Sequence, residues 1–177
     1  MKLLLIMLIP VLAFAQQKNI STVDKVDLSK YLGLWYEIAR IPNSFQDDCV
    51  NGTTAKYSLM NNGDIKVINS CMEADGGLNI AEGVARVVDK KTNSKLEVSF
   101  VSLFGWHLFW GDYWIIGLDD NYKWAVIGHP KRKYGWILSR TPKLDETTMT
   151  AINKILFANG YDPQKFVKSE QMNVGNK

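Results

Sequence analysis

Few residues in this chain have the types and spacing that enzymes use. Its two histidines, His107 and His129, lack the neighbouring Cys, Asp or Glu pattern of a metal site, and no Gly-x-Ser-x-Gly, His-Glu-x-x-His or phosphate-loop motif occurs. The carboxylate pairs at 47–48 and 119–120 are adjacent in sequence, so in an extended chain their side chains point apart and make poor acid–base pairs. We therefore predict no catalytic residue, no metal site and no cofactor, and a binding protein rather than an enzyme.

The two cysteines, Cys49 and Cys71, could form a disulfide. Residues 52–60 and 64–71 alternate in polarity on either side of an Asn-Asn-Gly-Asp turn, which predicts a β-hairpin that sets Thr53 opposite Cys71. Cys49 then lies just beyond the strand end, near Cys71. Two buried thiols are the alternative, but an exported chain favours the disulfide.

The first fifteen residues predict a secretory signal peptide. Lys2 gives a positive start, Leu3–Leu12 is a short apolar run, and Ala13-Phe14-Ala15 is a small-x-small cleavage site. This apolar run is too short to span a bilayer, which takes about 20 residues. No Cys lies near the cleavage site. We expect an exported protein, periplasmic or secreted, whose association with an outer membrane would not use a lipid-modified cysteine.

The elements that must position a site are short strands. Runs rich in Val, Ile, Tyr and Trp, separated by turn residues, predict an all-β sandwich or barrel, and Met149, Ile152 and Leu156 at helical spacing predict one helix that ends at Asn159-Gly160. Each strand has one apolar face, as a sheet closed around an interior requires, and the helix should pack outside it. The predicted strands are 34–41, 52–60, 64–71, 79–88, 95–102, 112–118, 122–128 and 135–140, with a short terminal strand at 165–169.

Composition agrees with one globular domain. Hydrophobic residues make up 46% of the chain and charged residues 22%, and a formal net charge of +3 is too small to indicate a nucleic-acid partner. Six Trp, seven Tyr and seven Phe supply apolar surface with polar edges, which suits a lined cavity or an interface.

Three motifs, in order, resemble the signatures of the lipocalin family. Gly33-Leu34-Trp35 resembles the Gly-x-Trp signature of the first strand, Leu118–Tyr122 is similar to the second signature, and Trp136–Pro142 resembles the third. The bacterial outer-membrane and apolipoprotein D-like branch is the most similar. The resemblance implies an eight-stranded antiparallel up-and-down barrel that holds a small apolar ligand. We expect a signal peptide (1–15), an N-terminal segment (16–27), a barrel domain (28–170) and a C-terminal tail (171–177).

The resemblance also implies structural roles for Gly33, Trp35 and Arg140. In the family pattern the arginine at the end of the last strand lies across the tryptophan ring at the closed end of the barrel. Such a cation–π stack stabilises by about 0.5–2 kcal/mol, depending on how far it is desolvated.

Strand alternation assigns the side chains that would line the cavity. An inward Asn69 in a hollow barrel would need a water or a ligand as its hydrogen-bond partner. Small-molecule sites are mostly apolar with a few placed polar groups, although ordinary core packing is the alternative for each position. The predicted lining residues are Tyr57, Asn69, Phe100, Trp114, Ile116, Trp136 and Leu138.

The stretch 103–114 is too apolar for an ordinary solvent loop. In a lipocalin it falls at the open end, where it either folds inward as a lid or contacts a membrane or a partner. Cations in the next loop at that end could face anionic headgroups. The predicted membrane-facing residues are Phe104, Trp106, Phe109, Trp110, Lys131, Arg132 and Lys133.

Together these observations predict an exported lipocalin that carries or stores an amphiphile of the fatty acid or lysophospholipid class. Its partners would be that ligand and a membrane surface, with no nucleic acid. An alternative is an enzyme on the same barrel that acts on an apolar lipid or carotenoid, for which Glu37 is the one carboxylate that alternation places inside. A barrel filled by its own side chains, with a structural role, is a third hypothesis.

Overall fold

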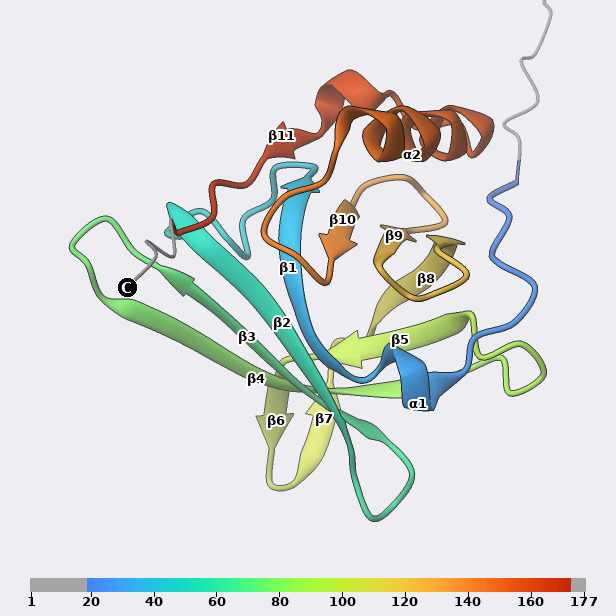
Figure 1. Ribbon diagram of the computed structural model, residues 1–177. Coiled ribbons are helices and arrows are strands. Elements are labelled where there is room, and N and C mark those ends of the chain that lie inside the picture. The colour runs from blue at the N-terminus through green and yellow to red at the C-terminus, as the bar shows by residue number, and fades with distance from the viewer. Residues whose placement is uncertain (1–18, 173–177) are drawn as a thin grey trace, which may run out of the picture.

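The computed structural model describes residues 19–172, so the predicted signal peptide and most of the predicted C-terminal tail lie outside the described residues. Within this range eight antiparallel strands form a ring that is closed by the pairing of β1 with β10 (Figure 1). The predicted eight-stranded barrel is confirmed. The ring runs β10 (Gly135–Ser139), β9 (Trp124–Gly128), β8 (Gly111–Leu118), β5 (Lys95–Ser99), β4 (Leu78–Val87), β3 (Ile65–Met72), β2 (Asn51–Leu59) and β1 (Gly33–Arg40).

The C-terminal elements lie outside the ring. α2 (Glu146–Ala158) lies across the outer surface of the barrel (Figure 1), and the side chain of its N-cap, Asp145, accepts a hydrogen bond from the Thr148 amide. A 3-10 turn, η1 (Pro163–Lys165), leads to β11 (Val167–Lys168), which pairs with the end of β1. The outer helix that the sequence predicted is therefore present, and the terminal strand is shorter than predicted.

Apolar side chains pack in two layers, one inside the barrel and one between the barrel and α2. In the inner layer Trp35 and Ile115 are 0% exposed and Leu138 is 4% exposed. The outer layer joins Ile152 and Leu156 of α2 to Ile116, Val126 and Ile137 of β8, β9 and β10. These three strands are thus covered by apolar side chains on both faces.

The N-terminal segment packs onto the barrel well before the predicted domain start at residue 28. Ile20 belongs to the outer layer, and Val26 is 0% exposed in the inner layer. The Val23 amide donates to the Ile115 carbonyl at 3.0 Å, although this segment forms no strand. The folded unit therefore includes the residues that lead into β1.

One end of the barrel is closed by α1 (Leu28–Tyr31) and by Arg140. The guanidinium carbon of Arg140 lies 3.7 Å from the centroid of the Trp35 ring, which is the stack that the lipocalin resemblance implies. Gly33, between α1 and the stack, has a φ of +97°, and a Cβ there would lie 3.4 Å from the guanidinium. The guanidinium also donates at 2.6–3.1 Å to the carbonyl oxygens of Lys30, Tyr31, Leu32 and Leu34.

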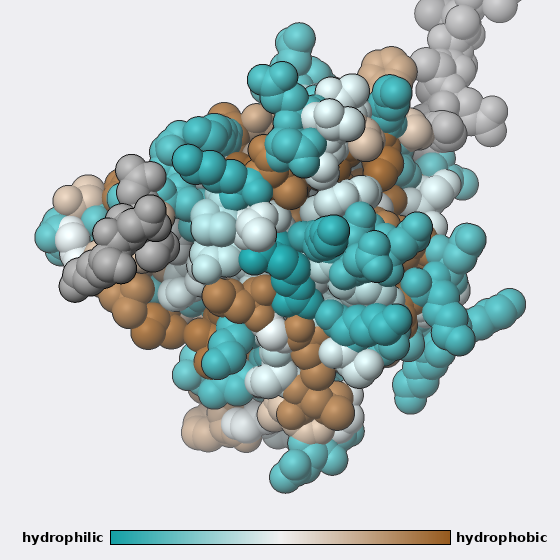
Figure 2. Space-filling model, in the orientation of Figure 1, coloured by the Kyte–Doolittle hydropathy of each residue, from teal (hydrophilic) through white to brown (hydrophobic). Residues whose placement is uncertain are grey.

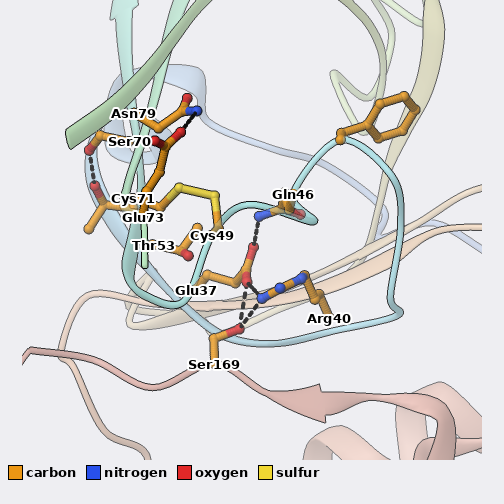
Figure 3. The surroundings of a disulfide bond; sticks show 12 residues. Glu37, Arg40, Gln46, Cys49, Thr53, Ser70, Cys71, Glu73, Asn79 and Ser169 are labelled. Carbon is orange, nitrogen blue, oxygen red and sulfur yellow. Dashed lines mark hydrogen bonds and ion pairs between the residues drawn. A yellow bond between two sulfur atoms is a disulfide. The ribbon is translucent and has the colours of Figure 1, made fainter. Parts of the chain in front are cut away.

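The predicted disulfide between Cys49 and Cys71 is confirmed, with Cα atoms 5.6 Å apart (Figure 3). It ties the loop between β1 and β2 to β3. The amide of Val50 donates to the Met72 carbonyl at 2.9 Å beside it. The disulfide and this hydrogen bond hold the C-terminal end of the loop between β1 and β2. Other residues of the same loop lie at the mouth of the barrel.

A hairpin that the sequence did not predict projects from the barrel (Figure 1). Its strands are β6 (Val101–Leu103) and β7 (Trp106–Leu108), which pair only with each other among the described strands. The turn residues Phe104 and Gly105 have φ angles of +49° and +81°, the left-handed pair that a type I′ turn requires. At the base, the Ser99 hydroxyl lies within hydrogen-bond distance of the backbone oxygens of Val101 and Leu108, one at each end of the hairpin, and its single proton can be donated to either.

We predict that Arg140→Ala lowers the free energy of unfolding by about 3 kcal/mol or more, because carbonyls of the α1 region lose a charged donor and the Trp35 ring loses its cation. Arg140→Lys keeps the charge but has one donor nitrogen, so it should recover only part of this loss. Urea denaturation followed by tryptophan fluorescence measures both. An alanine variant as stable as wild type would contradict the structural role.

We predict that the Cys49→Ser/Cys71→Ser variant still folds. Its melting temperature should fall by about 6–12 °C, because closing this loop stabilises by about 3 kcal/mol and each kcal/mol shifts a chain of this size by about 2–4 °C. Calorimetry before and after reduction gives the matched comparison, since reduced wild type should melt with the variant. Unchanged melting on reduction would show that the bond contributes nothing.

Candidate functional site

Inward-facing side chains become more exposed toward one end of the barrel. On β4 these positions run from Ala85, which is 3% exposed, through the buried Gly83 to the exposed Ala81. Phe100, just past β5, is 41% exposed although its ring lies against the inner side of Gly83. The interior is therefore packed at the closed end and open to solvent at the other, and the residues of the open half form the candidate site.

The structure places five of the seven predicted lining residues on the inner face. Tyr57 and Leu138 are 7% and 4% exposed and belong to the inner core, whereas Phe100 and Trp136 keep accessible surface. The fifth residue, Asn69, differs from these four because its side chain is an amide.

Asn69 is a polar side chain at the level where the barrel opens. It stands opposite Ala55 on β2 and Ala81 on β4, and neither small neighbour covers it. Its amide makes no hydrogen bond with any residue between 19 and 172. Both its donor and its acceptor are thus available to a molecule in the opening.

The prediction that Trp114 and Ile116 line the cavity is wrong. Tyr113 pairs with Leu96, which is buried inside the barrel. Tyr113 and Ile115 therefore face inward, and Trp114 between them faces outward. The pairing of β8 with β9 then shifts at a β-bulge between Ile115 and Gly117, which leaves Ile116 in the outer layer under α2. The Lys95 ammonium lies 4.4 Å from the centroid of the outward Trp114 ring.

Three tyrosine hydroxyls cross the interior below the opening. Tyr113 of β8 shares hydrogen bonds with Tyr31 of α1 at 2.7 Å and with Tyr57 of β2 at 3.0 Å. Burial raises the pKa of Tyr57 to about 12 and raises the pKa values of Tyr31 and Tyr113 well above their usual range. All three are therefore neutral, protonated donors at physiological pH, and partly exposed Tyr113 is the one that borders the accessible space.

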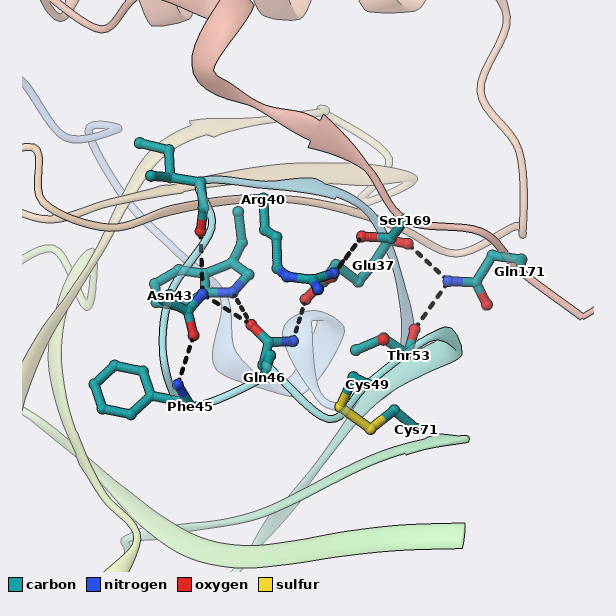
Figure 4. Close-up of polar contacts among 12 residues, drawn as sticks. Glu37, Arg40, Asn43, Phe45, Gln46, Cys49, Thr53, Cys71, Ser169 and Gln171 are labelled. Atoms are coloured by element: carbon teal, nitrogen blue, oxygen red, sulfur yellow. Dashed lines mark hydrogen bonds and ion pairs between the residues drawn. A yellow bond between two sulfur atoms is a disulfide. The ribbon is translucent and has the colours of Figure 1, made fainter. Parts of the chain in front are cut away.

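The loop between β1 and β2 reaches the mouth through Gln46 (Figure 4). The Gln46 side-chain oxygen accepts a hydrogen bond from the Trp136 indole at 3.0 Å, and its nitrogen donates to Glu37 at 2.7 Å. The Trp136 ring stacks on Tyr134 with centroids 6.0 Å apart, and Tyr134 contacts Phe45 at 5.2 Å. An amide and a row of aromatic rings therefore border the opening.

Glu37 is 3% exposed, and its carboxylate is occupied by neighbouring side chains (Figures 3 and 4). It forms an ion pair with Arg40 at 2.9 Å and accepts hydrogen bonds from Gln46 and from the Ser169 hydroxyl. The Gln171 amide donates to the backbone oxygen of Glu37 at 2.7 Å. Glu37 thus ties the mouth loop and the C-terminal segment to β1.

Aromatic side chains of hairpin β6–β7, and of Phe109 directly after it, are turned to solvent. Phe104 is 93% exposed, Phe109 is 83% exposed and Trp106 is 76% exposed, so the chain does not form the inward-folded lid that was the alternative. Leu78 and Ile80 on the outside of β4 are also exposed, at 62% and 55%. Figure 2 shows apolar surface along the lower side of the molecule in this view.

Two residues predicted to face a membrane are engaged in the fold instead. The Trp110 ring lies 4.0 Å from the Arg86 guanidinium on the outer wall, and its indole donates to a backbone oxygen of the hairpin. Arg132 donates at 2.7 Å to the Asn159 carbonyl at the end of α2. Arg132 belongs to the loop between β9 and β10. In this loop Lys131 and Lys133 have exposed side chains.

His129, at the start of the same loop, is a neutral acceptor rather than a cation. Its Nδ1 accepts a hydrogen bond from the Lys131 amide at 3.1 Å, and burial lowers its pKa. Within residues 19–172 no group of three or more His, Cys, Asp or Glu side chains could hold a metal ion. No helix in the described range has the length and hydropathy that crossing a membrane demands.

Sequence reasoning missed four residues of the site. Tyr134 precedes Trp136 by two positions, so extending the alternation by one step would have found it. Tyr113 was missed because the inner face of β8 was assigned to the neighbouring positions. Gln46 and Phe45 lie in a loop without periodicity, and no local pattern indicates that they turn toward the mouth.

Comparison with known proteins agrees with this architecture. A family model described as a lipocalin-like domain matches residues 26–171. The chain is 36% identical over 155 residues to outer membrane lipoprotein Blc from Escherichia coli K12, which covers 87% of this chain and 84% of that protein. It is 38% identical over 158 residues to apolipoprotein D from Rattus norvegicus, which covers 85% and 79%.

A plant relative and a solved insect structure extend the likeness. Temperature-induced lipocalin-1 from Arabidopsis thaliana is 35% identical over 159 residues, covering 88% of this chain and 85% of that protein. Insecticyanin from the tobacco hornworm Manduca sexta superposes with a TM-score of 0.71 at 25% identity, covering 88% of this chain and 86% of the other. The closed barrel, the outer helix and the family match together show that the chain belongs to the lipocalin family.

Proposed function

We propose that the protein is a carrier or store of a small amphiphile, of the fatty acid or lysophospholipid class, held in the open half of the barrel. The observation that carries this proposal is the exposure of inward-facing Ala81 and Phe100 above a packed floor. Lipocalins bind small hydrophobic ligands, and burying an acyl chain is favourable by about 0.8 kcal/mol for each CH₂ group.

The distribution of polar groups supports an amphiphile rather than a purely apolar ligand. Asn69 offers an amide near the opening that no residue between 19 and 172 engages, and Gln46 and the Trp136 indole lie at the mouth. A ligand with its chain in the barrel and its headgroup at this level would meet apolar walls below and hydrogen-bonding groups above.

Export is part of the same proposal. The segment 1–15 has the pattern of a signal peptide, and the Cys49–Cys71 disulfide is typical of an oxidising compartment. One relative is named as an outer membrane lipoprotein. We propose a periplasmic or secreted location, with the mature chain beginning after residue 15.

The alternative of an enzyme acting on a lipid or carotenoid has less support. Its candidate acid–base group, Glu37, is paired with Arg40 and accepts hydrogen bonds from Gln46 and Ser169. A carboxylate bound in this way anchors the structure and lacks a free face toward the cavity.

We further propose that hairpin β6–β7 contacts a lipid surface. Phe104 and Phe109 have φ angles of +49° and +55°, a left-handed conformation that is costly for bulky residues, and both are more than four-fifths exposed. Asn or Gly would relieve this cost at both positions, so folding does not explain the aromatic rings. Contact with a bilayer does, because Phe side chains bury apolar surface at the boundary of headgroups and acyl chains, and the neighbouring Trp106 favours the headgroup region.

The cations Lys131 and Lys133 lie on a loop at the same end of the barrel as the hairpin. The His129 Nε2 atom, at the start of that loop, is 3.8 Å from a carboxylate oxygen of Asp112, the second residue of the strand that follows the hairpin. Each cation that reaches an anionic surface should add about 1 kcal/mol to binding.

We predict that Ala81→Trp weakens the binding of long-chain fatty acids at least about tenfold, since it fills the opening from an inward position. Ile80→Trp is the matched control, because Ile80 is the neighbouring residue on the outer face of the same strand. Native mass spectrometry of delipidated protein with palmitic acid, together with tryptophan fluorescence, measures the effect. Absence of uptake by wild type, or equal loss in both variants, would contradict a ligand site in the barrel.

We predict that Phe104→Asn/Phe109→Asn lowers affinity for vesicles of phosphatidylglycerol and phosphatidylcholine at least about tenfold. Its melting temperature should stay the same or rise, because Asn suits the left-handed backbone. Phe157→Asn is the control, since Phe157 is 78% exposed on α2, away from the hairpin. Unchanged co-sedimentation of the double variant with the vesicles, or a large fall in its melting temperature, would contradict the proposed membrane contact.

A further inference from the structure

Among the residues that the structure describes, the three tyrosine hydroxyls of the inner layer have one more proton than they have acceptors. Each phenol has one O–H donor, and the chain Tyr31–Tyr113–Tyr57 contains two hydrogen bonds. No other group among residues 19–172 accepts a hydrogen bond from any of the three. Whichever way the two bonds are oriented, two protons are used and one O–H is left over.

This spare donor lies in an apolar setting where a missing partner is costly. Val67, Leu96 and Ile115 belong to the same inner layer and are at most 3% exposed. The Tyr31 ring rests on Trp35 with centroids 5.0 Å apart, so the hydroxyls lie above the closed end. A buried donor without an acceptor loses its hydration and gains nothing in return.

A hydrogen-bond acceptor for the spare O–H could approach from the open half of the barrel. Tyr31 and Tyr57 are 2% and 7% exposed, whereas Tyr113, which bonds to both, keeps accessible surface. The Arg140 guanidinium on the other side is already occupied by the Trp35 ring and by backbone carbonyls. An acceptor that reaches the hydroxyl chain therefore enters from the open half.

We propose that the tyrosine chain is a second polar subsite of the cavity, which takes a neutral oxygen carried on the buried part of the ligand. This inference rests on the proposed function and narrows its ligand class to oxygenated acyl chains, such as hydroxy or oxo fatty acids. The headgroup lies at the level of Asn69 and Gln46, and the chain oxygen lies at the level of the hydroxyls. Selectivity then depends on the number of carbons between the two oxygens.

Two series of probes test the subsite. ω-Hydroxy fatty acids with 10, 12, 14 and 16 carbons are compared with unsubstituted acids of the same lengths, by native mass spectrometry and competitive displacement of a fluorescent fatty acid. At one chain length the ω-hydroxy acid should bind about three- to tenfold more tightly than its partner, the range that one net hydrogen bond gives. Tyr57→Phe and Tyr113→Phe should remove this preference, so that the ω-hydroxy acid binds no more tightly than the unsubstituted acid of the same length.

Tyr36→Phe is the matched control, because Tyr36 lies beside Trp35 on β1 but packs in the outer layer. It should leave both series unchanged. Tighter binding of the unsubstituted acid at every length would overturn the subsite and leave the carrier function standing. Equal weakening of both series by Tyr57→Phe and Tyr113→Phe, with a lower melting temperature, would make the chain a structural brace and overturn it too. Failure of wild type to bind either series would overturn the subsite together with the proposed function.

Discussion

The Arg140 guanidinium, stacked on Trp35 and bonded to the carbonyls around α1, closes one end of the barrel, while the other end stays open to solvent. An open end forfeits the dispersion contacts that a filled core would supply, so the rest of the molecule must provide the stability. Arg140 gathers the carbonyls around α1 and stacks on Trp35, while α2 buries a second apolar layer against the outside of the wall. The closed end and the outer layer under α2 thus stabilise the barrel. The inward-facing side chains of the open half can therefore remain accessible to solvent.

The same outer layer explains which part of the site the sequence could not reveal. On β2 and β3 the outer face carries polar residues such as Lys56 and Lys66, and strict alternation placed Tyr57 and Asn69 on the inner face. On β8 both faces are apolar because α2 covers the outside, so the pattern holds no signal to distinguish Tyr113 from Trp114. A bulge then changes the alternation within the strand. Only the pairing with β5 decides the question.

Local patterns and ordered motifs were enough for the barrel, the disulfide and the closed end. They were not enough for the segments that join the strands. Gln46 reaches the mouth because its loop is held by Cys49 at one side and by Glu37 at the other, and these are contacts between distant parts of the chain. The stretch around Trp106 was recognisable as too apolar for a solvent loop, but its hairpin was not, because its type I′ turn has a phenylalanine where Asn or Gly is usual.

The buried carboxylate of Glu37 shows how the mouth is tied to the C-terminus. Its oxygens are shared by Arg40, by Gln46 of the mouth loop and by Ser169 near β11, and Gln171 bridges the backbone oxygens of Glu37 and Thr53. The last described residues therefore occupy the gap where β1 and β2 separate toward the open end. Because the Gln46 oxygen also holds the Trp136 indole, the position of a lining residue depends on a network that begins far from it in sequence. In this fold a carboxylate that could have served catalysis is used to set the shape of the opening.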